Sequence, residues 1–143
     1  MQALRVESVK KDEILTAVGK RKRAVARAFA KKGSGKVRLN KIPLEVFEPE
    51  LARMIISEPL ILAGDAAKKV DIDVSLTGGG IFGQADAARQ AIAKILVQVD
   101  SKLKEVFLSY DRNLLIADPR RTEPHKPSRS KKGPRRHKQR SKR

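Results

Sequence analysis

Clustered lysines and arginines are the side chains of this 143-residue chain with the most distinctive chemistry. Lys20, Arg21, Lys22 and Arg23 are consecutive, and Arg27 follows close behind. A guanidinium can bind a phosphate through two parallel hydrogen bonds, whereas a lysine ammonium acts as a point charge. Lysines on an exposed edge strand also oppose aggregation, so a solvated strand edge is the alternative interpretation. We interpret the block as a phosphate contact because a second basic segment accompanies it.

That second segment is residues 119–143, which hold twelve Lys or Arg and one acid. It contains four of the seven prolines and no Val, Ile, Leu, Met or aromatic residue. Such a composition cannot bury enough apolar surface to offset the entropy of ordering, so we expect an arm that is disordered in the free protein. Without aromatic residues for stacking, the arm should bind along a phosphate backbone. Its candidate contacts are Arg120, Arg121, Lys126, Arg129, Lys131, Lys132, Arg135 and Arg136.

The charge of the chain is unevenly distributed. Thirty-three Lys and Arg oppose sixteen Asp and Glu, for a net charge of +17. Residues 10–41 carry +10, residues 42–118 carry −4 and residues 119–143 carry +11. Charge acquired only for solubility would be dispersed, so the two concentrated segments indicate a polyanionic partner. Lys36, at the tip of the predicted 32–36 turn, adds to the first segment.

The glycine-rich run Gly78-Gly79-Gly80-Ile81-Phe82-Gly83 formally matches the dinucleotide fingerprint. The match is incomplete, because Asp100 follows a predicted helix rather than a second parallel strand. Two interpretations stay open: a purely structural turn, or backbone amides of Gly78, Gly79 and Gly80 that meet a nucleic-acid phosphate at a helix N-terminus.

We find no support for catalysis or for a cofactor. The two histidines, His125 and His137, both lie in the basic arm, and the chain has no cysteine. Asp71 and Asp73 share one strand face and could hold Mg²⁺, but the alternation of a solvated strand explains them better. No nucleophile, base and orienting group can be assembled, so we predict neither an enzyme nor a metal site. No apolar run reaches the length of a membrane helix, and we expect a soluble intracellular protein.

The basic block and the glycine run should be positioned by a small fold of both strands and helices. Residues 14–31 read as one long strand, with Ala24, Ala26, Ala28 and Ala30 on one face. The turn 32–36 should fold this strand back onto 37–39 as a hairpin. Strict alternation over 70–77 predicts a half-buried strand, and 114–117 reads as a short last strand.

Helices should alternate with these strands. Pro49 suits a helix start, Pro59 should stop that helix, and a short second one should end at Gly64. Further helices are predicted over 84–99, and from Asp100 or Ser101 to about 110. The expected class is α+β, a two-layer α/β sandwich. We divide the chain into an unassigned segment 1–13, a globular RNA-binding domain 14–118 and the basic arm 119–143.

Several ordered segments together resemble the universal ninth protein family of the small ribosomal subunit, in its archaeal form. They cover the chain from about residue 14 to its end. They are residues 19–28 (GKRKRAVARA), Gly78–Gly80 with Gly83–Ala85, Tyr110–Arg112 and residues 118–127 (DPRRTEPHKP).

The resemblance implies a sandwich with a left-handed βαβ crossover and a structural role in the head of the small subunit, on the 3′ major domain of its ribosomal RNA. It implies neighbouring ribosomal proteins as partners and a cytoplasmic location in the ribosome. The arm should reach toward the peptidyl site, where Arg140, Lys142 and Arg143 would contact transfer RNA. The family usually has an aromatic residue near this tip, whereas residues 139–143 have none.

Two other functions remain alternatives on composition alone. The tail would suit a DNA-compacting protein, and the glycine run would suit a nucleotide-binding enzyme. Co-sedimentation with small subunits or with DNA separates the first from the ribosomal interpretation, and titration with labelled nucleotide tests the second.

Overall fold

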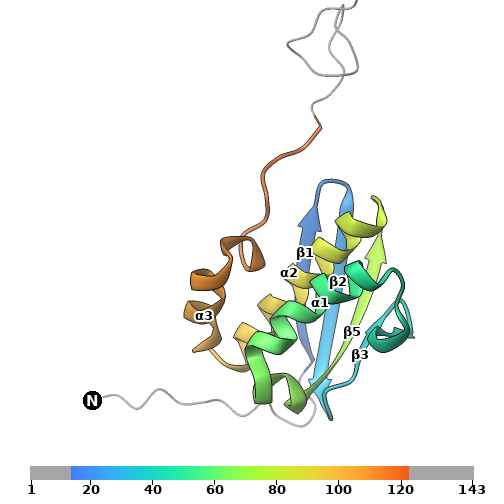
Figure 1. Cartoon of the computed structure of the whole chain (residues 1–143). Helices are drawn as coiled ribbons and strands as arrows, with labels where there is room; N and C mark the ends of the chain where they lie inside the picture. The colour runs from blue at the N-terminus through green and yellow to red at the C-terminus, as the bar shows by residue number, and fades with distance from the viewer. Residues whose placement is uncertain (1–13, 123–143) are drawn as a thin grey trace, which may run out of the picture.

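The computed structural model of the chain describes residues 14–122 (Figure 1). Its sheet has five strands in the order β1-β2-β5-β3-β4. The strands are β1 (Leu15–Arg21), β2 (Ala24–Lys32), β3 (Val37–Leu39), β4 (Ile42–Pro43) and β5 (Val70–Thr77). The helices are α1 (Glu50–Ala63), α2 (Ile81–Val99) and α3 (Leu103–Tyr110), with 3-10 turns η1 (Leu44–Val46), η2 (Gly64–Lys69) and η3 (Arg112–Leu114).

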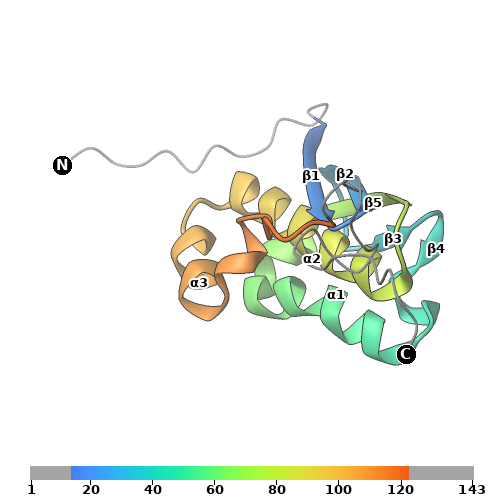
Figure 2. The same ribbon diagram turned by 90° about the horizontal axis from the view of Figure 1, so that it is seen from above.

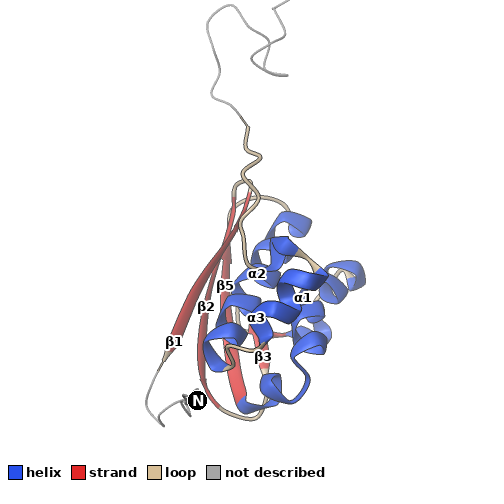
Figure 3. Ribbon diagram, turned by 90° about the vertical axis from the view of Figure 1, so that its left-hand side faces the viewer, coloured by secondary structure: helices blue, strands red, loops and turns tan. Residues whose placement is uncertain are grey.

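The helices form one layer and the sheet the other, as Figure 3 shows edge-on, so the predicted two-layer sandwich is confirmed. The alanine face of β2 is at most 1% exposed and meets α2. Small side chains there let the helix come close to the sheet. Gly19 allows the closest approach, since a Cβ on it would lie 1.9 Å from the carbonyl oxygen of Ala87.

The chain crosses from β3 through α1 to β5, and β3 and β5 are parallel neighbours. Seen from the helix side with β5 running upward, β3 lies to the right of β5, so the connection steps to the left (Figures 1 and 3). The crossover is therefore left-handed, against the strong right-handed tendency of βαβ units, as the resemblance implied.

Two strand predictions are wrong. Residues 14–31 form two antiparallel strands rather than one, because Arg21 pairs with Ala24 across the turn residues Lys22 and Arg23. The predicted hairpin through 32–36 does not form either, since β5 lies between β2 and β3. The eight-residue β5 covers the alanine strand along nearly its whole length, which the three-residue β3 cannot do.

The helix limits also differ from the prediction. Pro59 does not end α1 but lies buried inside it, where packing offsets the lost hydrogen bond. The helix continues to Ala63 and is capped by Gly64, the residue that was predicted to end a separate second helix. Residues 114–117 form no strand: η3 ends at Leu114, which alone among these four residues is fully buried.

Candidate nucleic-acid interface

The β1–β2 turn presents two cations at one end of the sheet. Lys22 and Arg23 are the two turn residues, and both are exposed. Lys22 has a φ of 53°, the left-handed conformation that closes so short a turn. Neither side chain forms an ion pair within residues 14–122. The turn therefore projects two uncompensated positive charges beyond the sheet.

Arg21 behaves differently from its neighbours in the sequence. Its side chain is 21% exposed, its Nε lies 3.5 Å from Oδ2 of Asp86, and its guanidinium forms an ion pair with Asp118. Lys20 is exposed, and its backbone N–H donates to Oε1 of Gln90 at 2.9 Å. The predicted four-residue cationic block is thus divided: Lys20, Lys22 and Arg23 face solvent, while Arg21 is held by two carboxylates.

The glycine run packs directly against this turn. Gly78 and Gly79 have φ angles of 71° and 68°, which favour glycine. A Cβ on Gly78 would lie 2.6 Å from the carbonyl oxygen of Arg23. Gly80 precedes α2, whose N-terminus has no side-chain cap. The unpaired N–H groups and positive dipole end of α2 therefore lie beside the exposed cations, an arrangement that favours an anion.

Phe82, which the sequence analysis missed, is 51% exposed in the first turn of α2. It could have been noticed, because it is an aromatic residue inside the glycine run. Lys41, which was also missed, is exposed in the β3–β4 turn with a φ of 71°. Asn40 ties that turn to β5 through hydrogen bonds to Leu76, at the level of Ala26 in β2, so Lys41 lies to the side of the β1–β2 turn.

The chain leaves the described region from the same end. After η3 it runs from beside α3 to the tip of β1 (Figure 2). Asp118 accepts a backbone N–H of Arg120 at 2.9 Å, and its Oδ2 lies 2.6 Å from the Arg120 guanidinium. Arg120 remains 76% exposed despite this pair, and Arg121 is also exposed.

The other predicted arm contacts lie outside the described residues. They are Lys126, Arg129, Lys131, Lys132, Arg135, Arg136, Arg140, Lys142 and Arg143, together with His125 and His137.

Two predicted contacts lie elsewhere on the molecule. Arg27 is exposed midway along β2, on the sheet face opposite the helices. Lys36 precedes β3, at the far end of the sheet from Lys22. The structure therefore does not gather all predicted phosphate contacts into one surface.

Asp71 and Asp73 each have a partner from the chain itself. Asp71 accepts hydrogen bonds from the backbone N–H groups of Ser34 at 2.8 Å and Lys36 at 2.9 Å. These donors lower the pKa of its carboxyl group, and the N–H of Lys36 has the largest effect. Asp73 forms an ion pair with Arg38 at 3.1 Å. Within residues 14–122 no group of three or more metal-ligating side chains gathers.

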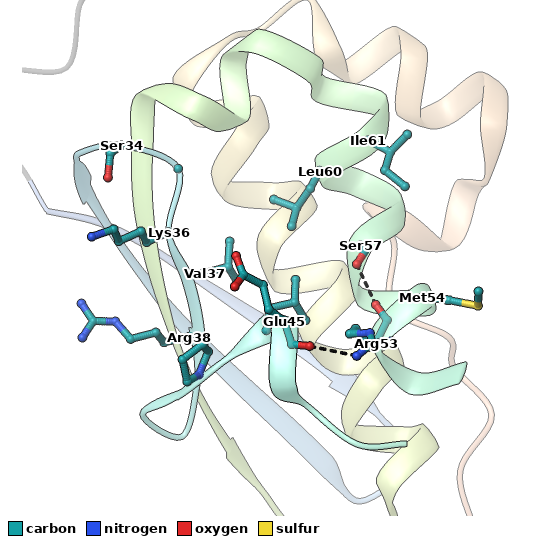
Figure 4. A pocket seen from close by; sticks show the side chains of 13 residues that line it. Ser34, Lys36, Val37, Arg38, Glu45, Arg53, Met54, Ser57, Leu60 and Ile61 are labelled. Carbon is teal, nitrogen blue, oxygen red and sulfur yellow. Dashed lines mark hydrogen bonds between the residues drawn. The ribbon is translucent and has the colours of Figure 1, made fainter. Parts of the chain in front are cut away.

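A groove of about 1080 Å³ lies between α1 and the β3–β4 side of the sheet (Figure 4). Arg53 donates to the carbonyl oxygen of Glu45 at 2.8 Å, and Ser57 donates to that of Arg53. The charged ends of Lys36 and Arg38 point away from α1. Arg53 and Ser57 thus bond to backbone carbonyl oxygens. The other serine of the groove, Ser34, lies 3.5 Å from the Asp71 carboxylate, which already accepts backbone N–H groups, and residues 14–122 contain no histidine that could activate either serine.

Residues 19–143 match the family described as Ribosomal protein S9/S16. This chain belongs to that family. Small ribosomal subunit protein uS9 from Methanococcus maripaludis strain C7 is 55% identical over 131 residues, covering 90% of this chain and 98% of the relative. The protein of the same name from Methanococcus vannielii is 53% identical over the same shares.

As a member of the S9/S16 family, the chain is a structural, non-enzymatic protein of the small ribosomal subunit. The match begins at Gly19, so it contains the cationic turn, the glycine run and residues 119–143. Among the helices of residues 14–122, none is long and apolar enough to span a membrane.

Proposed function

We propose that the chain binds small-subunit ribosomal RNA through one end of its sheet, which we call the turn-end surface. The turn-end surface consists of Lys20, Lys22, Arg23, Gly78, Gly79, Gly80, Arg120 and Arg121. The observation that carries the proposal is the contact between the cationic β1–β2 turn and the glycine turn before the uncapped N-terminus of α2. Exposed cations and free amides on one surface suit phosphate oxygens.

Other predicted residues take altered roles in this proposal. Arg21 acts mainly by holding Asp118, because its guanidinium is already paired. Arg27 would make a separate contact from the open sheet face. Phe82, half exposed beside the glycine turn, can stack on an unpaired base.

The basic segment 119–143 continues this contact, beyond the globular domain of residues 14–118. Its twelve cations would neutralise crowded RNA phosphates, and its last ones, Arg140, Lys142 and Arg143, would contact peptidyl-site transfer RNA. The start of the segment supports this role: Asp118 pairs with Arg21, so the segment begins beside the turn-end surface. We expect neighbouring ribosomal proteins as further partners, in the cytoplasm.

A binding series in increasing salt tests the RNA contact. The full chain is titrated onto a transcript of the 3′ major domain of archaeal small-subunit RNA. Each neutralised phosphate contributes roughly 0.7–0.9 to the slope of log K against log salt. Lys22→Gln/Arg23→Gln should therefore weaken binding and lower the slope by about 1.5.

The control is Lys102→Gln/Lys104→Gln, which removes two exposed charges beside α3. Equal effects of the two double variants would refute the turn-end surface, and tighter binding to duplex DNA than to the transcript would favour a DNA-compacting function. For the arm, deleting Lys142 and Arg143 should weaken peptidyl-site transfer RNA without affecting assembly, and unchanged occupancy would contradict that role.

A further inference from the structure

A second group of cations lies at the opposite end of the sheet. We call it the far-end lysine cluster: Lys31, Lys32, Lys36, Lys68 and Lys69. Lys31 and Lys32 end β2, Lys36 immediately precedes β3, and Lys68 and Lys69 end η2 just before β5. Figure 1 shows these three segments meeting at the lower end of the sheet, away from the β1–β2 turn. All five lysines are exposed.

The backbone that carries these lysines is held in one arrangement. Asp71 accepts the N–H groups of Ser34 and Lys36, as described above. The N–H of Gly33 donates to the carbonyl oxygen of Lys69 at 3.0 Å, and that of Ile72 donates to Lys36 at 2.8 Å. The 33–36 loop and the end of η2 are therefore tied together, so the cluster is preorganised although it comes from separate segments.

Glycine makes this close arrangement possible. A Cβ on Gly33 would lie 2.1 Å from the Asp71 carboxyl carbon, and one on Gly35 would lie 3.0 Å from the Cα of Lys68. Gly35 also has a φ of 89°, in the region that favours glycine. The Lys-Gly-Ser-Gly-Lys sequence thus brings the loop backbone against both the acid that orders it and the η2 lysines.

The positive charge of the cluster is only partly compensated. Within residues 14–122, Lys68 is the member that forms an ion pair, with Asp65 at 2.9 Å between two exposed side chains. The Asp71 carboxylate accepts backbone N–H groups. Among residues 14–122, the five ammonium groups lie beside the carboxylates of Asp65 and Asp71, so positive charge is in excess on this surface.

Protection of a sheet edge does not explain these lysines. The edge strands are β1 and β4, whereas β2 and β5 are interior. Lysines placed against edge-to-edge pairing belong on the edge strands. On the edge strand β1, two backbone carbonyl oxygens already accept hydrogen bonds from α2. Lys94 donates to Val18 and Gln98 donates to Thr16.

The cluster and the turn-end surface are electrostatically separate. β2 runs between them for nine residues, roughly 30 Å at about 3.3 Å per residue. The Debye length at physiological salt is about 8 Å, so phosphates at one end are screened from cations at the other. The two surfaces also lie at opposite ends of the strands. One short stretch of RNA backbone therefore does not reach both of them.

We propose that the far-end lysine cluster binds the phosphate backbone of a second segment of the ribosomal RNA, so that the globular domain bridges two RNA segments. This inference rests on the proposed function and adds a second, independent contact to it. Five lysines without an arginine indicate charge neutralisation rather than bidentate recognition of a base. The domain would then fix the spacing of two RNA elements by the length of its sheet.

Hydroxyl-radical footprinting of the 3′ major domain transcript tests the bridge with the full-length chain. The far-end variant is Lys32→Gln/Lys36→Gln/Lys69→Gln. It leaves Lys31 unchanged because that residue lies opposite Asp71, and it leaves Lys68 unchanged because that residue forms an ion pair with Asp65. The matched turn-end variant is Lys20→Gln/Lys22→Gln/Arg23→Gln, and Lys102→Gln/Lys104→Gln is the control. Circular dichroism and urea unfolding establish that each variant folds.

We expect each triple variant to lose protection over a different RNA segment. Each should also lower the salt slope by about 2 units, for roughly three phosphates. An unchanged footprint and slope for the far-end variant alone would refute the bridge and leave the proposed function intact. Loss of one shared segment by both variants would mean that a single RNA element lies along the sheet, which also refutes the bridge. No effect of either variant would refute both proposals.

Discussion

Asp118 forms an ion pair with Arg21, a residue 97 positions earlier in the chain. Arg21 ends β1, and Asp118 follows η3, so the pair fastens the last described segment to the tip of the first strand. Asp118 is 9% exposed at its side chain and also holds Arg120. One carboxylate thereby determines where the basic C-terminal segment leaves the globular domain.

Asp118→Asn removes the charge that holds Arg21 and Arg120. We expect the free energy of unfolding to fall by about 1.5–3 kcal/mol, the range for hydrogen bonds to charged groups. Amide hydrogen exchange should rise over residues 115–120, because that segment loses its attachment. Glu105→Gln, at an exposed site on α3, is the control. Unchanged exchange over 115–120 would show that Asp118 does not anchor the segment.

Gly19→Ala should be strongly destabilising. The added Cβ would lie 1.9 Å from the Ala87 carbonyl oxygen, a backbone atom of α2, so the strand or helix must shift. We expect a loss of at least about 2 kcal/mol in urea unfolding. Gly80→Ala is the matched control, because a Cβ there meets nothing within 4 Å and should cost less than about 1 kcal/mol. Similar losses for both variants would contradict the close β1–α2 contact.

Arg89 joins three elements through its guanidinium. It lies 2.5 Å from a Glu58 carboxylate oxygen of α1 and 2.9 Å from one of Asp111, and its side chain is 15% exposed. Arg89→Met leaves two carboxylates facing each other without a cation. We expect about 2–3 kcal/mol lower stability, less than a fully buried pair because the carboxylates are partly exposed. Arg89→Met/Glu58→Gln should recover part of the loss, and a double variant as unstable as the single one would contradict this pairing.

Asp71 should contribute stability that depends on pH. Backbone N–H donors hold the pKa of its carboxyl group below the ordinary value of 3.8, and the N–H of Lys36 has the largest effect. A group whose pKa is lower in the folded state stabilises it above the unfolded pKa, and this contribution is lost as the pH falls through the folded pKa. The stability difference between wild type and Asp71→Asn should therefore be largest near about pH 6 and shrink below about pH 4. Urea unfolding across this range measures it, and a constant difference would disprove the role of the carboxylate.

Much of the fold is readable from local patterns. Strict alternation identified the 70–77 strand. The small side chains of the 24–30 alanines indicated a face that another element could approach closely, and the structure shows that this element is α2. Gly64 does end a helix, as predicted, because a glycine at a helix end acts locally, but that helix is α1 and not a separate second one. The sequence predicts that Leu103, Val106 and Phe107 face inward from α3. Leu103 and Phe107 are buried, but Val106 is 43% exposed because the short α3 presents a narrow buried face.

The errors occur where distant partners override local signals. The Lys-Gly-Ser-Gly-Lys turn looks like a hairpin loop, but β2 pairs with the eight-residue β5 along nearly its whole length, which the three-residue β3 could not match. Pro59 lies within α1 because its ring is buried against the rest of the molecule. Neither outcome is visible in the residues next to the turn or the proline.

The sequence by itself determined the charge segregation, the absence of catalytic chemistry and the family resemblance, because these depend on which residues are present and in what order. The tertiary structure alone decided which cations share a surface. It paired Arg21 with Asp86 and Asp118, packed Gly78 against Arg23, and placed Lys36 at the other end of the sheet from Lys22. Sheet order and ion pairing act between residues far apart in the chain, so no local pattern contains them.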